Sequence, residues 1–158
     1  MPVLNSPAEV DAWLSTGGWH PGRRCDDLAA TEVARAQEEF RVDGGHIEVI
    51  EPALAFLREH IGVVLTRNTS PKDLLEFVPA LAYEGAAEDV QELADGLGKK
   101  VFPVAFDTYD GGTVLMDEAG RFFYLHWSGE YYLGDDKYSA LMKYSHGQPL
   151  ENAWSYYA

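Results

Sequence analysis

Short apolar runs separated by polar, glycine-containing turns over residues 101–134 predict three or four short strands laid end to end. Three apolar runs stand in this stretch, at residues 101–106, 113–116 and 121–127. Turns that contain glycine separate or follow them, at residues 110–112, 118–120 and 128–129. Gly and Asp readily adopt the left-handed backbone angles that tight hairpins need. We therefore predict a β-meander in this half of the chain.

The most aromatic of these runs, residues 121–127, is expected to lie in the middle of the sheet. Successive side chains of a strand point to opposite faces. One face then carries Arg121, Phe123, Leu125 and Trp127, and the other carries Phe122, Tyr124 and His126. Both faces hold large apolar groups, so we expect both to be covered.

Apolar residues spaced three and four apart predict helices elsewhere in the chain. Five are expected: between the Ser6 cap and Gly17, over about 28–40, 51–60 and 88–97, and between the Asp135-Asp136 cap and Gly147. Shorter strands are predicted at 63–66 and 74–78, with a polar loop at 67–72 between them. The architecture is thus expected to be α+β, with helices packed on a mostly antiparallel sheet.

A chain of 158 residues has room for one domain with a real core. We assign residues 1–150 to that domain. Residues 151–158 form an aromatic tail that the pattern does not place.

The net charge of −14 narrows the choice of partner. Such a chain repels phosphate backbones and anionic lipids, so neither nucleic acid nor a membrane is expected to bind it. It would attract a basic protein instead. The alternative is that the charge serves solubility alone.

The N-terminus shows no basic segment followed by an apolar one, so no signal peptide is expected. The single cysteine, Cys25, cannot form an internal disulfide, which suits a reducing compartment. We expect a soluble cytoplasmic protein, and the sequence leaves its oligomeric state open.

No pattern of catalytic or metal-binding residues is found in the sequence. The five histidines are far apart, and neither a zinc motif nor a phosphate-binding glycine loop occurs, so no metal and no cofactor are expected. His126 is expected to be a hydrogen-bonded histidine of its strand. Cys25 follows two arginines but precedes two aspartates, and His20 is the only histidine nearby. A thiol-dependent hydrolase that uses Cys25 and His20 is a minor alternative to a protein without enzymatic activity.

Aromatic and acidic residues are interleaved at two places, which makes them candidates for binding a partner. The first set comprises Asp107, Tyr109 and Asp110, and the second comprises Trp127, Glu130, Tyr131, Tyr132, Asp135 and Asp136. Tyrosine and tryptophan dominate the energetics of protein interfaces, and carboxylates around them steer a basic partner. The alternative is that these rings close the edge of the core and the acids solvate it.

Three segments resemble motifs of one known family. Residues 18–24, GWHPGRR, resemble the G-W-x-P-G-R signature of the third branch of the SUKH superfamily. Residues 97–104 are similar to its L-G-x-x-x-F-P-x segment, and residues 117–123 to its D-x-x-G-R hairpin. The matches follow the family's order over residues 8–147. The chain departs from the pattern at Val78, where the family has an aspartate before proline, and at Gly62, where it has two glycines.

This resemblance implies a compact α+β fold whose sheet carries helices on one side. It also implies a role as an immunity protein of bacterial polymorphic toxin systems, which binds a cognate toxin domain, often a nuclease or deaminase, in the cytosol. Such families contribute no catalytic residues, so the resemblance assigns none to this chain. A general protein-binding scaffold or regulatory domain of the same superfamily is the alternative.

Overall fold

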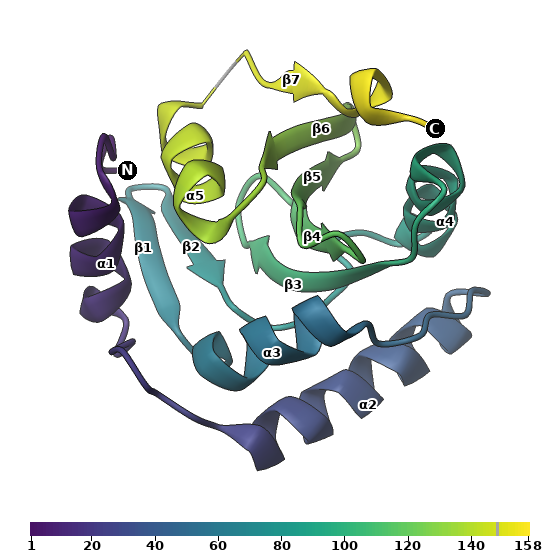
Figure 1. Ribbon diagram of the computed structural model, residues 1–158, viewed down its shortest axis with the longest axis horizontal. Coiled ribbons are helices and arrows are strands. Elements are labelled where there is room, and N and C mark those ends of the chain that lie inside the picture. Colours follow the sequence, from purple (N-terminus) through teal and green to yellow (C-terminus); the bar gives the residue numbers. More distant parts are fainter. Residues whose placement is uncertain (148) are drawn as a thin grey trace.

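The computed structural model describes residues 1–147 and 149–158 (Figure 1). The helices of this part of the chain are α1 (Pro7–Thr16), α2 (Asp26–Val42), α3 (Glu51–His60), α4 (Ala86–Leu97), α5 (Lys137–His146) and a short 3₁₀ helix, η1 (Ala153–Tyr156). The strands are β1 (Val64–Thr69), β2 (Lys72–Glu76), β3 (Val101–Asp107), β4 (Thr113–Asp117), β5 (Phe122–His126), β6 (Gly129–Gly134) and β7 (Glu151–Asn152).

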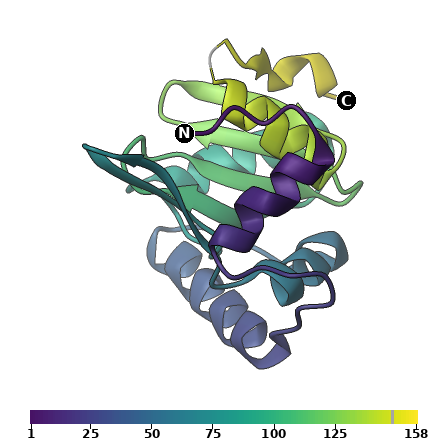
Figure 2. The ribbon, with the colours of Figure 1, turned by 90° about the vertical axis from the view of Figure 1, so that its left-hand side faces the viewer.

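The strands form one antiparallel sheet in the order β1 to β7, so each strand pairs with its neighbours in the sequence. Consecutive antiparallel strands reverse direction. The β1–β2, β3–β4 and β5–β6 turns therefore lie at the same end of the sheet, which we call the hairpin end. In Figure 2 the β1–β2 hairpin projects from this end.

Strand β5 is covered on both faces, as its sequence predicts. On one face the Phe122 ring meets Phe56 of α3 at 5.4 Å between centroids, and Tyr124 meets Tyr144 of α5 at 5.7 Å. On the other face Phe123 meets Tyr156 of η1 at 6.4 Å. The α+β fold with its antiparallel sheet is thereby confirmed.

The C-terminal tail, which the sequence pattern does not place, belongs to the cover of the second face. Its strand β7 pairs with β6, and the Tyr156 ring stacks on Tyr132 at 3.9 Å. The amide of Ala158 donates to the Gly96 carbonyl of α4 at 2.9 Å. The tail therefore joins α4 to the sheet edge.

The polar loop predicted at residues 67–72 is wrong. Strand β1 continues to Thr69 and β2 already begins at Lys72, so only Ser70 and Pro71 form the turn. The β1–β2 hairpin lies at the edge of the sheet, where alternate side chains face solvent. A polar run there is compatible with extended strands.

The first family-like motif, residues 18–24, anchors the N-terminal segment to α3. Trp19 is buried, and its Nε1 donates to Glu59 Oε1 at 3.1 Å. The Arg23 guanidinium donates to the carbonyls of Glu59 at 2.8 Å and Ile61 at 2.6 Å. These carbonyls stand at the C-terminal end of α3, where a cation is favourable.

His60, at the end of α3, is buried between aromatic rings. It stacks on Phe56 at 4.0 Å, and its Nδ1 lies 2.9 Å from the Phe56 carbonyl, which can only accept a hydrogen bond. Nδ1 is therefore protonated, and Nε2, 3.3 Å from Lys137 Nζ, accepts. Burial lowers the pKa of His60 to about 4, and the Lys137 charge adds to that effect.

We expect this histidine to make the fold sensitive to mild acid. In the unfolded chain histidine titrates near pH 6.5, so between about pH 6.5 and 4 only the unfolded state gains the proton. This difference should cost about 3 kcal/mol of stability by pH 4, and none of it should appear above pH 7. Urea unfolding of the wild type and of His60→Phe between pH 4 and 8 tests it. For each protein the free energy of unfolding is plotted against pH. The difference between the two slopes gives the contribution of His60, because the carboxylates titrate in both proteins. Equal slopes would contradict the assignment.

Candidate functional site

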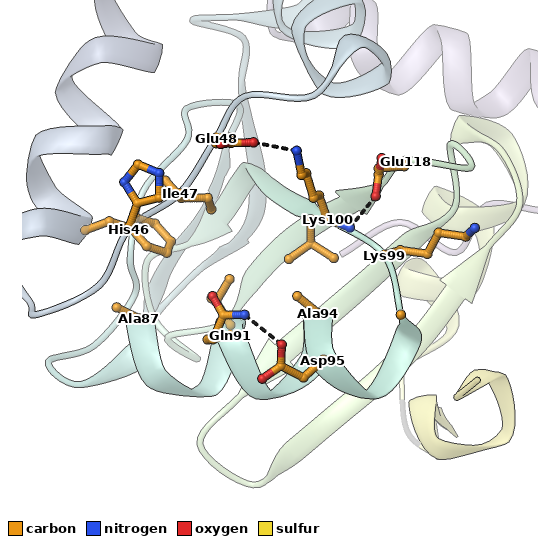
Figure 3. A pocket seen from close by; sticks show the side chains of 14 residues that line it. His46, Ile47, Glu48, Ala87, Gln91, Ala94, Asp95, Lys99, Lys100 and Glu118 are labelled. Carbon is orange, nitrogen blue, oxygen red and sulfur yellow. Dashed lines mark hydrogen bonds and ion pairs between the residues drawn. The ribbon is translucent and has the colours of Figure 1, made fainter.

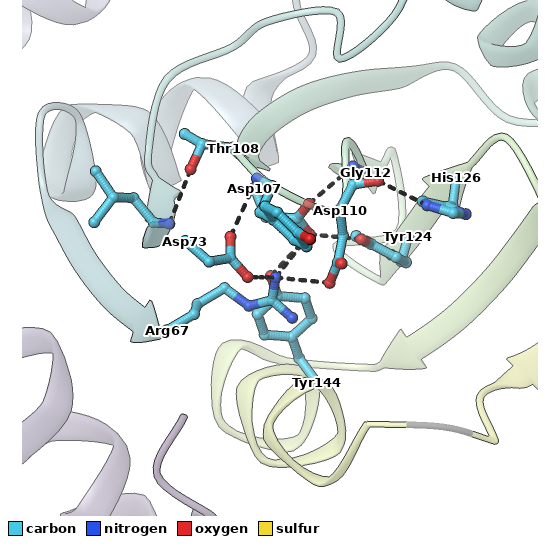
Figure 4. A network of polar contacts seen from close by, with 11 residues as sticks. Arg67, Asp73, Asp107, Thr108, Asp110, Gly112, Tyr124, His126 and Tyr144 are labelled. Carbon is cyan, nitrogen blue, oxygen red and sulfur yellow. Dashed lines mark hydrogen bonds and ion pairs between the residues drawn. The ribbon is translucent and has the colours of Figure 1, made fainter. Parts of the chain in front are cut away.

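The hairpin end brings together charged residues from three strands and a turn (Figure 4). Nη1 of Arg67, on β1, lies 2.5 Å from Asp73 Oδ2 and 2.9 Å from Asp110 Oδ2. It also lies 3.7 Å from Oδ2 of Asp107. One largely buried guanidinium is thus shared by three carboxylates. We call these four residues the hairpin cluster.

Asp107 is the buried centre of this cluster. Its Oδ2 accepts hydrogen bonds from Tyr124 Oη at 2.5 Å and Tyr144 Oη at 2.9 Å, and its Oδ1 accepts from the amide of Gly112 at 3.0 Å. A side chain at position 112 would collide with Tyr124, since a Cβ there would lie 2.0 Å from its hydroxyl. The sequence places Asp107 on a partner-binding surface, and the structure corrects this: its side chain is fully buried.

The groups around Asp107 are held in protonation states that suit these bonds. Burial raises the pKa of Tyr124, and the nearby Asp107 carboxylate raises it further. The same two causes raise the pKa of Tyr144. Both hydroxyls therefore remain protonated donors at neutral pH. Burial also raises the pKa of Asp73, while the charge of Arg67 opposes this shift.

Two large rings are exposed on the turns of the hairpin end. Tyr109 on the β3–β4 turn is 62% exposed and Trp127 on the β5–β6 turn is 76% exposed, while the side chain of Asp110, the residue after Tyr109, is 48% exposed. His126 connects the two turns, because its Nε2 lies 2.8 Å from the Asp110 carbonyl and its ring centroid 5.2 Å from that of Trp127. We call Tyr109, Asp110 and Trp127 the hairpin surface.

His126 is a hydrogen-bonded histidine, as its position in the strand suggests. The Asp110 carbonyl can only accept, so Nε2 carries the proton. Nδ1 then accepts from Ser128, whose Oγ is 2.8 Å away. The Nε2 bond joins the β3–β4 and β5–β6 turns, and the Nδ1 bond fixes the ring within its own hairpin.

The other candidates of the second sequence set are spread along β6 and beyond it. Glu130 and Tyr131 lie half-buried next to the β5–β6 turn, where Tyr131 Oη is 3.0 Å from Ser128 Oγ. Tyr132 donates to Asp135 Oδ1 at 2.5 Å, and Asp136 caps α5 by accepting from the Ser139 amide at 2.8 Å. The last three candidates, Tyr132, Asp135 and Asp136, therefore lie toward the opposite end of β6 from the hairpin surface.

Sequence reasoning missed Arg67, Asp73 and Tyr144 as parts of the site. One signal was present for Arg67, which follows the apolar Leu65 by two residues. In a strand these two share a face, and a charged residue on an inner face requires a partner. Asp73 and Tyr144 join the site through contacts between elements distant in sequence, for which no local pattern exists.

A pocket of about 500 Å³ lies between α4 and the segment that follows α2 (Figure 3). Its apolar walls include Phe40, Ile47, Val90 and Val101. Several polar groups on its rim pair with one another, as in the 2.5 Å contact of Lys100 Nζ with Glu48 Oε2 and the 2.8 Å bond of Gln91 to Asp95. His46 and Lys99 also line the pocket, which thus combines apolar walls with a polar rim.

Among the residues that the structure describes, no hydrogen bond links Cys25 to His20. Cys25 stands at the N-terminal cap of α2, and the exposed His20 has its Nδ1 3.0 Å from the carbonyl of Pro21. Within residues 1–147 and 149–158, no three His, Cys, Asp or Glu side chains are grouped to hold a metal ion. None of the helices in these ranges is both long enough and apolar enough to cross a membrane.

Comparison with known proteins identifies one family. A family model described as SUKH-3 immunity protein matches residues 6–147. That range includes all four residues of the hairpin cluster and all three of the hairpin surface. Searches of curated proteins and of solved structures found no match.

The buried role of Asp107 predicts a large effect on stability. Replacing Asp107 by alanine leaves two buried hydroxyls and the Gly112 amide without their acceptor, so we expect a loss of about 3 kcal/mol in the free energy of unfolding. Tyr109→Ala, two residues further along the chain in the exposed β3–β4 turn, should change it by less than about 0.5 kcal/mol. Chemical denaturation measures both. Similar stabilities of the two variants would contradict the buried assignment.

Proposed function

The chain belongs to the SUKH-3 immunity protein family, and from this premise we propose that it binds and neutralises a cognate bacterial toxin domain through the hairpin surface, without catalysis. The observation that carries the choice of surface is the exposure of Tyr109 and Trp127 on two turns that His126 links, with the half-exposed Asp110 carboxylate next to Tyr109 in the chain. We place this binding in the cytoplasm, where a toxin of the nuclease or deaminase class would act.

The two rings have the properties of interface anchors. Exposed tryptophan and tyrosine bury much area on binding and lose little conformational entropy, because each has only two side-chain torsions. The β3–β4 turn is held by the ion pair of Asp110 with Arg67, and the hydrogen bond of His126 to the Asp110 carbonyl links it to the β5–β6 turn. A partner therefore meets a surface that is already ordered, which reduces the entropic cost of association.

The charge of the chain favours a basic toxin. A net charge of −14 produces a field that speeds the approach of a positively charged domain. Asp110 uses Oδ2 for Arg67 but keeps about half of its side chain in solvent, so it can also meet a cation of the partner. A nuclease presents such cations to nucleic acid, and carboxylates can take the places of phosphates.

We expect Trp127→Ala and Tyr109→Ala each to raise the dissociation constant for the toxin domain encoded by the neighbouring gene at least tenfold, or about 1.4 kcal/mol. Both side chains are exposed, so the melting temperatures should remain within about 2 °C of the wild type. Calorimetric titration measures the affinity, and rescue of growth on co-expression with that toxin measures neutralisation.

Trp154→Ala is the matched control, because Trp154 is 66% exposed but belongs to the tail. It should leave affinity and rescue unchanged. If the toxin is not retained by the wild-type protein, the function proposed above is wrong. If it is retained but only Trp154→Ala weakens it, the function stands and the hairpin surface is the wrong site.

A further inference from the structure

A second pocket, of about 420 Å³, gathers arginines in this acidic chain. It is lined by Gly22, Arg23, Arg24, Ala55, Arg58 and Glu59, and we call it the arginine pocket. The chain has twelve Lys and Arg residues in all, and three of them meet here. The residues come from the family-like motif that precedes α2 and from residues 55–59 of α3.

The three guanidinium groups differ in their hydrogen-bond partners. Arg23 is bound to the carbonyls of Glu59 and Ile61, so its position is fixed. Arg24 binds Asp26 through Nε and Nη2. Arg58 makes no hydrogen bond and no ion pair through its side chain with any residue that the structure describes, although its half-buried position brings it to the pocket wall.

The two nearby acids do not balance all three guanidinium charges. Asp26 is paired with Arg24, and its pKa is lowered by that hydrogen bond and further by the charges of Arg24 and Arg58, while Glu59 accepts from the indole of Trp19 at 3.1 Å. Two carboxylates therefore face three guanidinium groups, which leaves one positive charge in excess among the three. The remaining acids of the chain act from a distance, and at physiological ionic strength charges more than about 8 Å apart are largely screened.

We propose that the arginine pocket binds an oxyanion of the phosphate class. A guanidinium presents parallel N–H donors that match the geometry of phosphate oxygens. Arg58 supplies a free fork of this kind, and Arg23 and Arg24 flank it. The volume lies within the range of roughly 300–1,000 Å³ that small-molecule sites occupy, so the pocket has room for the organic part of a phosphate ester as well.

Arg58 could instead serve only to stabilise the end of α3. Arg58 stands in the last turn of α3, where any cation is favourable to the helix dipole. Arg58→Lys keeps that charge but loses the planar fork. It should retain the wild-type melting temperature and bind phosphate about threefold more weakly. Arg58→Gln loses both charge and fork and should bind at least tenfold more weakly.

The test is an NMR titration of the full chain with inorganic phosphate, adenosine monophosphate and adenosine, at ionic strength held constant with sodium chloride. Both phosphates should shift the amides of Gly22, Arg24 and Glu59 in a saturable way, and adenosine should not. Tighter binding of the monophosphate identifies a phosphate ester as the ligand, whereas equal affinities identify the free ion.

Lys72→Gln is the matched control, because it removes the same charge from the distant β1–β2 hairpin. Its affinity should remain within twofold of the wild type. The proposal is overturned if the shifts do not saturate, if adenosine produces them equally, or if Arg58→Gln binds as well as Lys72→Gln does. Binding of phosphate is measured without the toxin, so its outcome is independent of the function proposed above.

Discussion

The buried carboxylate of Asp107 is the constraint on which the hairpin end depends. It accepts hydrogen bonds from β5, from α5 and from the β3–β4 turn, and it stands near the guanidinium of Arg67 on β1. An ionised carboxylate without partners costs several kcal/mol to bury. Its charge is tolerated only when these elements are all in place. The carboxylate therefore demands one arrangement of the strands, and that arrangement determines where the two exposed rings stand.

Much of the fold could be predicted because its signals are local. The limits of α3 follow from a proline in its first turn and a glycine after its end, and the meander follows from glycine turns between apolar runs. Asp107 could not be placed in this way. An aspartate beside a glycine turn is most often solvated, and only the register of β3 against β4 and the approach of α5 bury this one. Burial decided by distant elements leaves no trace in the neighbouring sequence.

Contacts between elements distant in sequence also explain why some of the candidate aromatic residues are exposed and others are covered. Trp127 and Tyr109 remain exposed, whereas Tyr132 is covered because the tail returns to the sheet and stacks Tyr156 on it. Seen along the sequence, Tyr132 and Trp127 are equivalent aromatic residues in an acidic setting. They differ because β7 of the tail pairs with β6, and these two strands are separated in the sequence by the whole of α5. Composition thus predicts the kind of side chains in the candidate set, and long-range pairing decides which of them remain exposed.

The hairpin surface and the arginine pocket differ in the range over which their charges act. The excess of acids extends over the whole chain, so its field reaches a basic partner before contact and affects mainly the rate of encounter. One unpaired guanidinium cannot reverse that field at a distance. It acts within a screening length, where the fork of Arg58 is close and the far carboxylates are screened. An anion must therefore be recognised by direct contact, while a toxin can be recognised first by attraction. Because the two proposed sites would select ligands of opposite charge by different means, one chain could carry both without competition between them.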